Sequence, residues 1–127
     1  MKKIILLALM LVTFLAVNAQ QKSYSNLKTE PFMEAVSHDN MQILDVRTPN
    51  EFSQGHIKNA KNINIFNKDF VKQAAKTLDK KKTVYVYCRS GGRSAKASAI
   101  LSDAGYDVVN LLGGFIGWQS AKYPIEK

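Results

Sequence analysis

The amino-acid sequence predicts an α/β fold of three layers, in which a central, mainly parallel sheet carries helices on both faces. Short apolar runs typical of strands alternate with segments of helical periodicity along most of the chain. Such alternation is typical of parallel sheets that are covered on both faces. The chain has 127 residues and the apolar content of a globular protein, which suits one domain.

Four elements are expected in the first half of the chain. Residues 29–36 predict a helix, because a proline lies in the first turn, where it is tolerated. Residues 41–46 form a short apolar strand pattern. Residues 49–54 predict a short helix that ends at Gly55, and residues 62–65 alternate like a strand.

Five elements are expected in the second half. Residues 70–78 place their apolar side chains on one side of a helix. Residues 83–87 are strongly β-prone. Residues 93–104 are small and helix-friendly, residues 107–111 form another strand pattern, and a glycine pair opens a last short helix over residues 113–118.

The first 19 residues have the pattern of a secretory signal peptide. Lys2 and Lys3 precede an almost unbroken apolar run over residues 4–17, and small residues lead to a cleavage position after Ala19. The run is short for a membrane-spanning helix, which needs roughly 20 residues, and no stop-transfer charges follow it. We therefore expect a periplasmic or secreted protein without a stable membrane anchor, whose residues 20–127 form a single domain.

The chain is basic, with a formal net charge of +8. A basic patch can bind nucleic acid, but no aromatic residues interleave with the lysines of residues 72–82, and an exported protein rarely meets nucleic acid. A solvated lysine-rich surface is the better interpretation. We expect no nucleic-acid partner, although the charge favours small anions.

The only cysteine, Cys88, lies between the strand pattern of residues 83–87 and the helix pattern that follows. It cannot form an intramolecular disulfide, so a single thiol of this kind calls for another explanation. Sites in parallel sheets lie where strand ends lead into helix starts. The residues expected to form an anion-binding loop around this thiol are Arg89, Ser90, Gly91, Gly92 and Arg93.

This loop should stabilise a thiolate. Glycines allow a tight curl whose N–H groups converge on an anion, the helix start adds partial positive charge, and Arg89 and Arg93 add full charges. Helix starts and neighbouring arginines lower the pKa of cysteine, and the thiolate is the nucleophilic form. The alternative is a buried, inert cysteine that acts as a small hydrophobic residue, for which a glycine-rich loop with two arginines is a poor setting.

Two reactions suit an activated thiolate beside an anion site: phosphoryl transfer, including arsenate reduction, and sulfur transfer through a cysteine persulfide. Cysteine-dependent phosphatases place five residues between the cysteine and the arginine of the loop. Here only four separate Cys88 from Arg93, and Ser94 stands at the phosphatase arginine position. The shorter loop favours sulfur transfer over phosphoryl transfer.

The sequence resembles the rhodanese, or thiosulfate sulfurtransferase, family over about residues 24–120. The resemblance begins at Leu44-Asp45-Val46-Arg47-Thr48-Pro49-Asn50-Glu51-Phe52 and continues at Gly55-His56-Ile57. It includes the Cys88 loop up to Ser94, and it ends in Gly105-Tyr106-Asp107-Val108 and Leu112-Gly113-Gly114-Phe115-Ile116-Gly117-Trp118. Several motifs in the right order make this a strong resemblance.

The resemblance implies a single-domain sulfurtransferase in which Cys88 carries a persulfide and residues 89–93 bind the outer sulfur and the donor. The implied partners are a small anionic sulfur donor such as thiosulfate, a thiol or cyanide-like acceptor, and a protein sulfur acceptor; no cofactor is implied. The alternative is a persulfide carrier that serves one protein partner and turns over small donors poorly. The sequence does not separate the two, because both need the same loop.

Asp45, Arg47 and Glu51 can be interpreted as an acid–base group or as a charged network that holds the loop after a strand, and the network is preferred. His56 is placed to orient that network. We expect no metal site, since His38 is the only other histidine. Trp118 is expected to be a core or lid aromatic residue rather than a substrate-stacking one.

Overall fold

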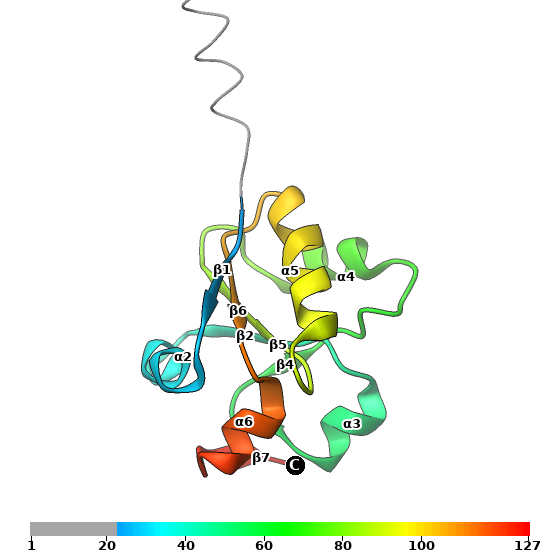
Figure 1. Ribbon diagram of the computed structural model, residues 1–127. Helices are drawn as coiled ribbons and strands as arrows, with labels where there is room; N and C mark the ends of the chain where they lie inside the picture. The colour runs from blue at the N-terminus through cyan, green and yellow to red at the C-terminus, as the bar shows by residue number, and fades with distance from the viewer. Residues whose placement is uncertain (1–22) are drawn as a thin grey trace, which may run out of the picture.

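The computed structural model describes residues 23–127 and shows a five-stranded sheet between two layers of helices (Figure 1). All neighbouring strands are parallel, and their order is β1 (Ser25–Leu27), β6 (Val108–Leu111), β5 (Val84–Tyr87), β2 (Gln42–Asp45) and β4 (Lys61–Asn62). The predicted α/β architecture is confirmed. The predicted signal peptide, residues 1–19, lies outside the described residues.

Helices cover both faces of the sheet and the edge at which its strands end (Figure 1). The helices α4 (Phe70–Thr77) and α5 (Gly92–Asp103) pack on one face, and α2 (Thr29–Val36) and α6 (Gly114–Ser120) contribute to the core on the other. The short helix α3 (Pro49–Gln54) lies near the carboxyl end of β2. These bounds agree with the predicted helices to within two residues.

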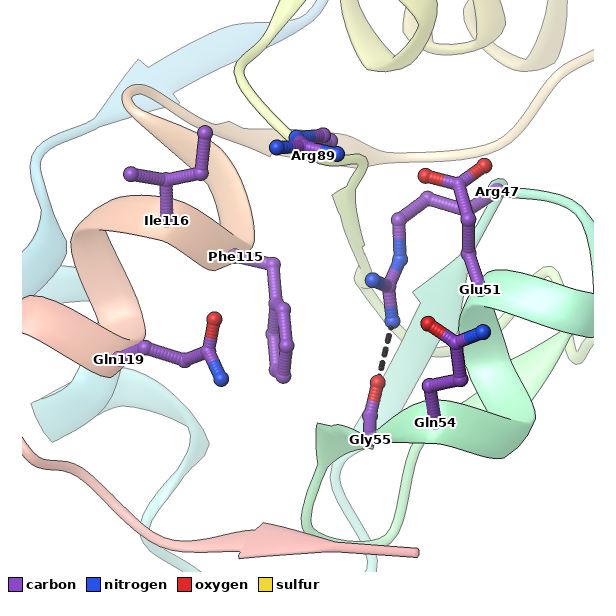
Figure 2. Close-up of a pocket in the computed structure, with 8 residues that line it drawn as sticks. All are labelled: Arg47, Glu51, Gln54, Gly55, Arg89, Phe115, Ile116 and Gln119. Carbon is purple, nitrogen blue, oxygen red and sulfur yellow. Dashed lines mark hydrogen bonds between the residues drawn. The ribbon is translucent and has the colours of Figure 1, made fainter.

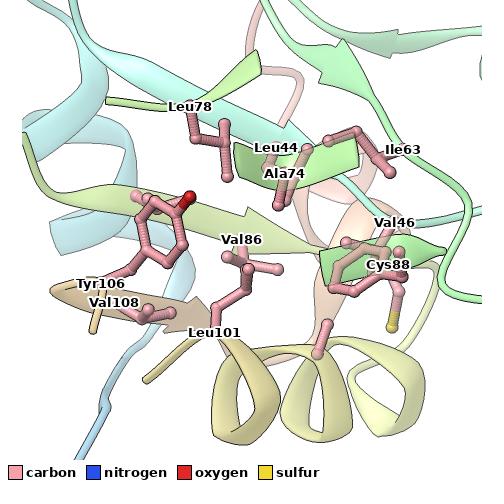
Figure 3. Close-up of a cluster of buried hydrophobic side chains, with 13 residues drawn as sticks. Leu44, Val46, Ile63, Ala74, Leu78, Val86, Cys88, Leu101, Tyr106 and Val108 are labelled. Carbon is pink, nitrogen blue, oxygen red and sulfur yellow. The ribbon is translucent and has the colours of Figure 1, made fainter. Parts of the chain in front are cut away.

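The two cores follow from the alternation of side chains along the strands. In β5, Val84 and Val86 face the cluster beneath α4 and α5, whereas Tyr85 and Tyr87 face the cluster that includes Phe32 of α2. Figure 3 shows the first cluster, which includes Cys88, the residue that directly follows β5. Cys88 therefore lies at the boundary between this core and the loop that joins β5 to α5.

Three strands were missed by the sequence analysis. The edge strand β1 has little apolar pattern of its own and forms through its pairing with β6. A small antiparallel sheet joins β3 (His56–Ile57) to β7 (Ile125–Glu126) near the end of the chain. The strand expected over residues 62–65 is shorter and lies earlier, at β4, although Ile63 and Ile65 still donate backbone hydrogen bonds to residues 45 and 46.

Candidate active site

The loop between β5 and α5 wraps its polar groups around the sulfur of Cys88. Gly91, with φ of 126°, stands at the N-cap of α5, and its N–H donates to Sγ with an N–S distance of 3.1 Å. The Ser94 hydroxyl lies 3.3 Å from Sγ and donates to the Gly91 carbonyl at 3.1 Å. A residue other than glycine adopts this backbone conformation only with strain, which explains the glycine at position 91.

Competing effects set the pKa of Cys88. Burial raises it, since a charged sulfur loses hydration. Hydrogen bonds from the Ser94 hydroxyl and from the backbone N–H groups of Ser94, Gly91 and Ser90 lower it, and together they prevail. The net pKa lies below the ordinary value of a thiol. The direction matches the sequence-based expectation, but hydrogen bonds of the loop, rather than the arginine charges, are the main cause.

Cys88 is also more deeply placed than a surface nucleophile, with 1% of its area exposed. Its surroundings combine features of both sequence-based interpretations. Its Cβ belongs to the core beneath α5, whereas its sulfur meets donors that an inert hydrophobic residue would not need. These contacts hold the sulfur close to the Gly91 N–H and the Ser94 hydroxyl.

The two arginines of the loop have different surroundings. Arg93 forms a two-pronged ion pair with Glu51 of α3, at 2.7 Å from Nη1 to Oε1 and 3.0 Å from Nη2 to Oε2. Arg89 is exposed, and among residues 23–127 it has no ion-pair partner. Within the described chain, Arg89 is thus the loop cation whose charge is unpaired, whereas a carboxylate already neutralises Arg93.

Glu51 has two structural roles. Its carboxylate accepts from the N–H of Thr48, and the Thr48 hydroxyl accepts from the N–H of Glu51, which forms a capping box at the start of α3. The ion pair with Arg93, opposed by partial burial, lowers the pKa of Glu51 to about 2. Glu51 is therefore ionised at neutral pH and links α3 to the thiol loop.

Asp45 and Arg47 form a buried pair, as expected for a network that holds the chain after a strand. The Arg47 guanidinium donates from Nε and Nη2 to the Asp45 carboxylate and from Nη2 to the Gly55 carbonyl at 2.7 Å. Glu51 is not part of this pair; it belongs to α3 and forms an ion pair with Arg93 of the loop. His56 contacts neither: its Nδ1 bonds the Phe52 carbonyl at 2.9 Å, and its ring stacks on Phe52.

A cleft of about 230 Å³ lies next to the loop, between α3 and α6. Figure 2 shows the residues that line it: Arg47, Glu51, Gln54, Gly55, Arg89, Phe115, Ile116 and Gln119. The Arg47 guanidinium lies over the Phe115 ring, 4.4 Å from its centroid. The sequence analysis gave no binding role to Gln54, Phe115, Ile116 or Gln119.

The start of α6 is fastened to the loop. The N–H of Phe115 donates to the Cys88 carbonyl at 2.8 Å, and that of Ile116 donates to the Arg89 carbonyl at 3.1 Å. Gly114 permits this approach, because a Cβ there would lie 2.7 Å from the Cys88 carbonyl oxygen and closer still to the backbone of Arg89. The cleft therefore adjoins the thiol loop directly. Trp118, in the same helix, is buried among apolar side chains, as expected of a core aromatic residue.

Two features are not found in residues 23–127. No group of three or more histidine, cysteine, aspartate or glutamate side chains could hold a metal ion there. Across the same stretch, no helix combines the length and the apolar character needed to cross a membrane.

The chain is similar to known proteins over most of its length. A family model described as the Rhodanese-like domain matches residues 28–121. The chain is 38% identical over 96 residues to thiosulfate sulfurtransferase 18 of Arabidopsis thaliana, which covers 66% of this chain and 71% of that protein. It is 36% identical over 88 residues to a protein named sulfurtransferase from Allochromatium vinosum. That match spans 68% of this chain and 79% of the relative.

Solved structures show the same fold. A rhodanese-related protein from Thermoplasma volcanium matches with a TM-score of 0.71 and 32% identity, over 81% of this chain and 98% of that one. A rhodanese-like domain protein from Staphylococcus aureus matches with a TM-score of 0.64 and 34% identity, over 74% of this chain and 90% of that one.

Proposed function

The chain belongs to the family of rhodanese-like domains and is a sulfurtransferase-type enzyme, and from this premise we propose that it takes sulfur from thiosulfate through a persulfide on Cys88. One observation carries the proposal: a buried thiol whose pKa is lowered by a ring of N–H and O–H donors at the end of a strand. The same donors suit the outer sulfur that a persulfide would add. Residues 89–93 are proposed to surround it.

The reaction begins with attack of the Cys88 thiolate on the outer sulfur of thiosulfate. A bond forms between the two sulfurs, the sulfur–sulfur bond within thiosulfate breaks, and sulfite leaves with the bonding electron pair. An acceptor nucleophile then removes the outer sulfur and restores the thiolate. The lowered pKa of Cys88 raises the fraction of the thiol that is ionised, and this thiolate attacks without a general base.

The anionic end of the donor is proposed to lie toward Arg89. Its charge is unpaired among the described residues, and it lines the cleft that adjoins the loop. Gly91 N–H and the start of α5 add partial positive charge on the sulfur side. Arg93 contributes less of its charge, since Glu51 holds it.

The test is turnover of thiosulfate with cyanide as the acceptor, in the purified protein and in Cys88→Ser. We expect turnover in the first and none in the second, because the serine hydroxyl cannot form a persulfide. Substantial turnover in Cys88→Ser would contradict the proposal. Hydrolysis of an aryl phosphate that disappears in Cys88→Ser would instead favour the phosphatase alternative.

A persulfide carrier for a protein partner is the second candidate. Leu112 and Ile116, which flank the glycine pair at the loop, are 43% and 46% exposed, and such side chains suit contact with a protein. A carrier would load sulfur but turn over small acceptors slowly. Turnover that rises only when a partner protein is added would distinguish the carrier from the enzyme.

We also propose that residues 1–19 direct export and that residues 20–127 form the mature domain. The support is the sequence pattern of a basic start, an apolar run and Ala19. Expression in a bacterial host with separation of periplasm and cytoplasm tests this. The expected result is a periplasmic protein whose intact mass corresponds to a chain that begins at Gln20. An unprocessed chain in the cytoplasm would contradict the proposal.

A further inference from the structure

A groove of about 670 Å³ lies on the face of the molecule where α4 and α5 cover the sheet (Figure 1). Its walls are α4, α5 and the loop that precedes α4, and its lining consists of residues 65, 67–72, 75, 96 and 100. Among the described residues, none lines both this α4–α5 groove and the cleft between α3 and α6. The groove is therefore separate from the site proposed for thiosulfate.

The α4–α5 groove has an apolar surface. Ile65 and Ile100 are only partly buried against the core, and Val71 is 44% exposed. Beside Ile65 on the loop, Phe66 is 68% exposed, although phenylalanine is among the residues most often buried in proteins. Contiguous exposed apolar side chains of this kind mark surfaces that a partner covers.

The loop that presents Phe66 is ordered by hydrogen bonds. The N–H of Phe66 donates to Asn64 Oδ1 at 3.0 Å, and the N–H of Asn67 donates to the Asn64 carbonyl at 3.1 Å. The Asn67 carboxamide donates to Gln73 Oε1 at 3.2 Å, which joins the loop to α4. The groove is therefore formed before a partner binds, which lowers the entropic cost of binding.

Lysines surround the apolar surface. Lys68, Lys72 and Lys96 line the groove, and none of them forms an ion pair within residues 23–127. Asp69 is the one acidic residue among the described lining residues, and its carboxylate accepts instead from the Gln73 carboxamide at 2.9 Å. The groove thus presents positive charges that pair with no carboxylate of the described chain, and an acidic partner would complement them.

The lining favours a helix as the occupant over an extended strand or a lipid bilayer. It comes from two helices and a loop and includes neither edge strand of the five-stranded sheet, β1 or β4, so a strand would find no backbone edge there. A bilayer surface contacts protruding side chains, whereas most of these apolar side chains line a hollow between lysines. An amphipathic helix can lay its apolar side into such a hollow.

We propose that the α4–α5 groove binds an acidic amphipathic helix of a partner protein. The apolar side of that helix packs on Val71 and Ile100, and its carboxylates lie beside the three lysines of the groove. Apolar contact supplies most of the affinity, since exposed ion pairs contribute little, whereas the lysines select an acidic partner and speed its association. This surface lies outside the sulfur-transfer site, so the inference does not depend on the proposed function.

The probe is a fluorescein-labelled peptide that forms an amphipathic helix, with leucine on one face and glutamate on the other. Fluorescence anisotropy at low salt measures its Kd for the purified protein, at a concentration where the peptide is monomeric. Two control peptides replace every glutamate by lysine or every leucine by serine. We expect the acidic peptide to bind about tenfold or more tightly than either control, because it alone complements both the charge and the apolar surface.

Lys72→Glu reverses one charge of the groove. We expect Kd for the acidic peptide to rise about fivefold, because an attraction at the rim becomes a repulsion. The variant should remain folded, since Lys72 is exposed and glutamate suits the first turn of a helix. Lys82→Glu is the matched control, because it makes the same change at an exposed lysine that does not line the groove. Its effect on Kd should be much smaller.

Absence of binding by the acidic peptide, equal binding of the lysine peptide, or equal Kd values in Lys72→Glu and Lys82→Glu would overturn the inference. If the acidic peptide does not bind, co-sedimentation of the protein with phosphatidylglycerol vesicles would assign the surface to a membrane. Self-association that Lys72→Glu abolishes would assign it to a second copy of the chain. Cys88→Ser should bind the peptide as the unaltered protein does, which separates this result from the sulfur chemistry.

Discussion

At the residue scale, a short chain of hydrogen bonds controls the thiol. In the protonated state, the Cys88 thiol can donate to the Ser94 hydroxyl, which donates to the Gly91 carbonyl. When the thiol loses its proton, the Ser94 hydroxyl can turn and donate to the sulfur instead. Together with the Gly91 N–H, it then stabilises the thiolate. Ser94, one residue beyond the expected loop, is therefore a positioning residue of the site.

We expect Ser94→Ala to weaken the nucleophile. The variant loses the largest hydrogen bond that lowers the pKa of Cys88, whereas burial continues to raise it. The thiolate is the form present above the pKa, so the pH profile of alkylation should move to higher pH. At neutral pH, the rate of alkylation by iodoacetamide should fall by about tenfold, the factor given by one hydrogen bond to a charged group.

Ser98→Ala is the control for this variant. Ser98 lies one turn further along α5, is fully buried, and its hydroxyl oxygen has no hydrogen-bond partner. Its loss should leave the alkylation profile in place and leave stability equal or higher. An unchanged profile in Ser94→Ala would show that the backbone N–H groups alone set the thiol pKa.

Glu51 limits the positive charge that the loop presents to its donor. At neutral pH its carboxylate is ionised, holds Arg93, and adds a negative charge near the proposed site for thiosulfate, a dianion. We expect Glu51→Gln to lower KM for thiosulfate by about threefold, as suits a partly exposed pair, with a smaller change in kcat. Glutamine also completes a capping box, so the start of α3 should remain formed.

The control for Glu51→Gln is Glu34→Gln. It removes the same charge from an exposed position of α2, at which no ion pair is formed within the described residues. Its KM should match that of the unaltered protein. A higher KM in Glu51→Gln would mean that the main effect of Glu51 is to hold Arg93 in its binding position.

At the scale of elements, the sequence predicted those parts of the fold that local residues determine. The helices α3 and α5 were predicted with their glycine stops, and β5 was predicted from a run of valine and tyrosine; the capping box at the start of α3 was found only in the structure. The strands β1, β3 and β7 have short and weak patterns. They exist because distant partners supply their hydrogen bonds, as β6 does for β1, so a local pattern could not predict them.

The contact of α6 with the loop also belongs to this scale. We expect Gly114→Ala to reduce the free energy of unfolding by about 2 kcal/mol or more, because its φ of 57° disfavours alanine and the added Cβ would meet the carbonyl groups of Cys88 and Arg89. Turnover should fall as well, since α6 would have to move from the loop. Urea unfolding and kcat/KM measure the two effects.

Gly92→Ala serves as the stability control. It stands in the first turn of α5 with nothing within 4 Å of an added Cβ. Helix propensity then predicts equal or greater stability for alanine. Similar losses of stability in Gly92→Ala and Gly114→Ala would mean that close packing of α6 on the loop does not explain the glycine at 114.

At the scale of the whole molecule, the fold combines a thiol loop whose place between a strand and a helix the sequence predicted with a cleft that it did not. The thiol loop is one continuous segment, so its chemistry could be deduced from neighbouring residues. The cleft draws Arg47, Gln54 and Gln119 from separate segments, which meet only because β2 and β5 are parallel neighbours and α6 returns to the loop. The pairing of Arg93 with Glu51 escaped prediction for the same reason.

The central claim is that Cys88 carries sulfur, and the most direct test is the intact mass of the purified protein after incubation with thiosulfate. We expect the mass to increase by one sulfur atom. The increase should be absent in Cys88→Ser and should disappear when cyanide is added. An unchanged mass after incubation, at a pH where the thiol reacts with iodoacetamide, would contradict thiosulfate as the donor.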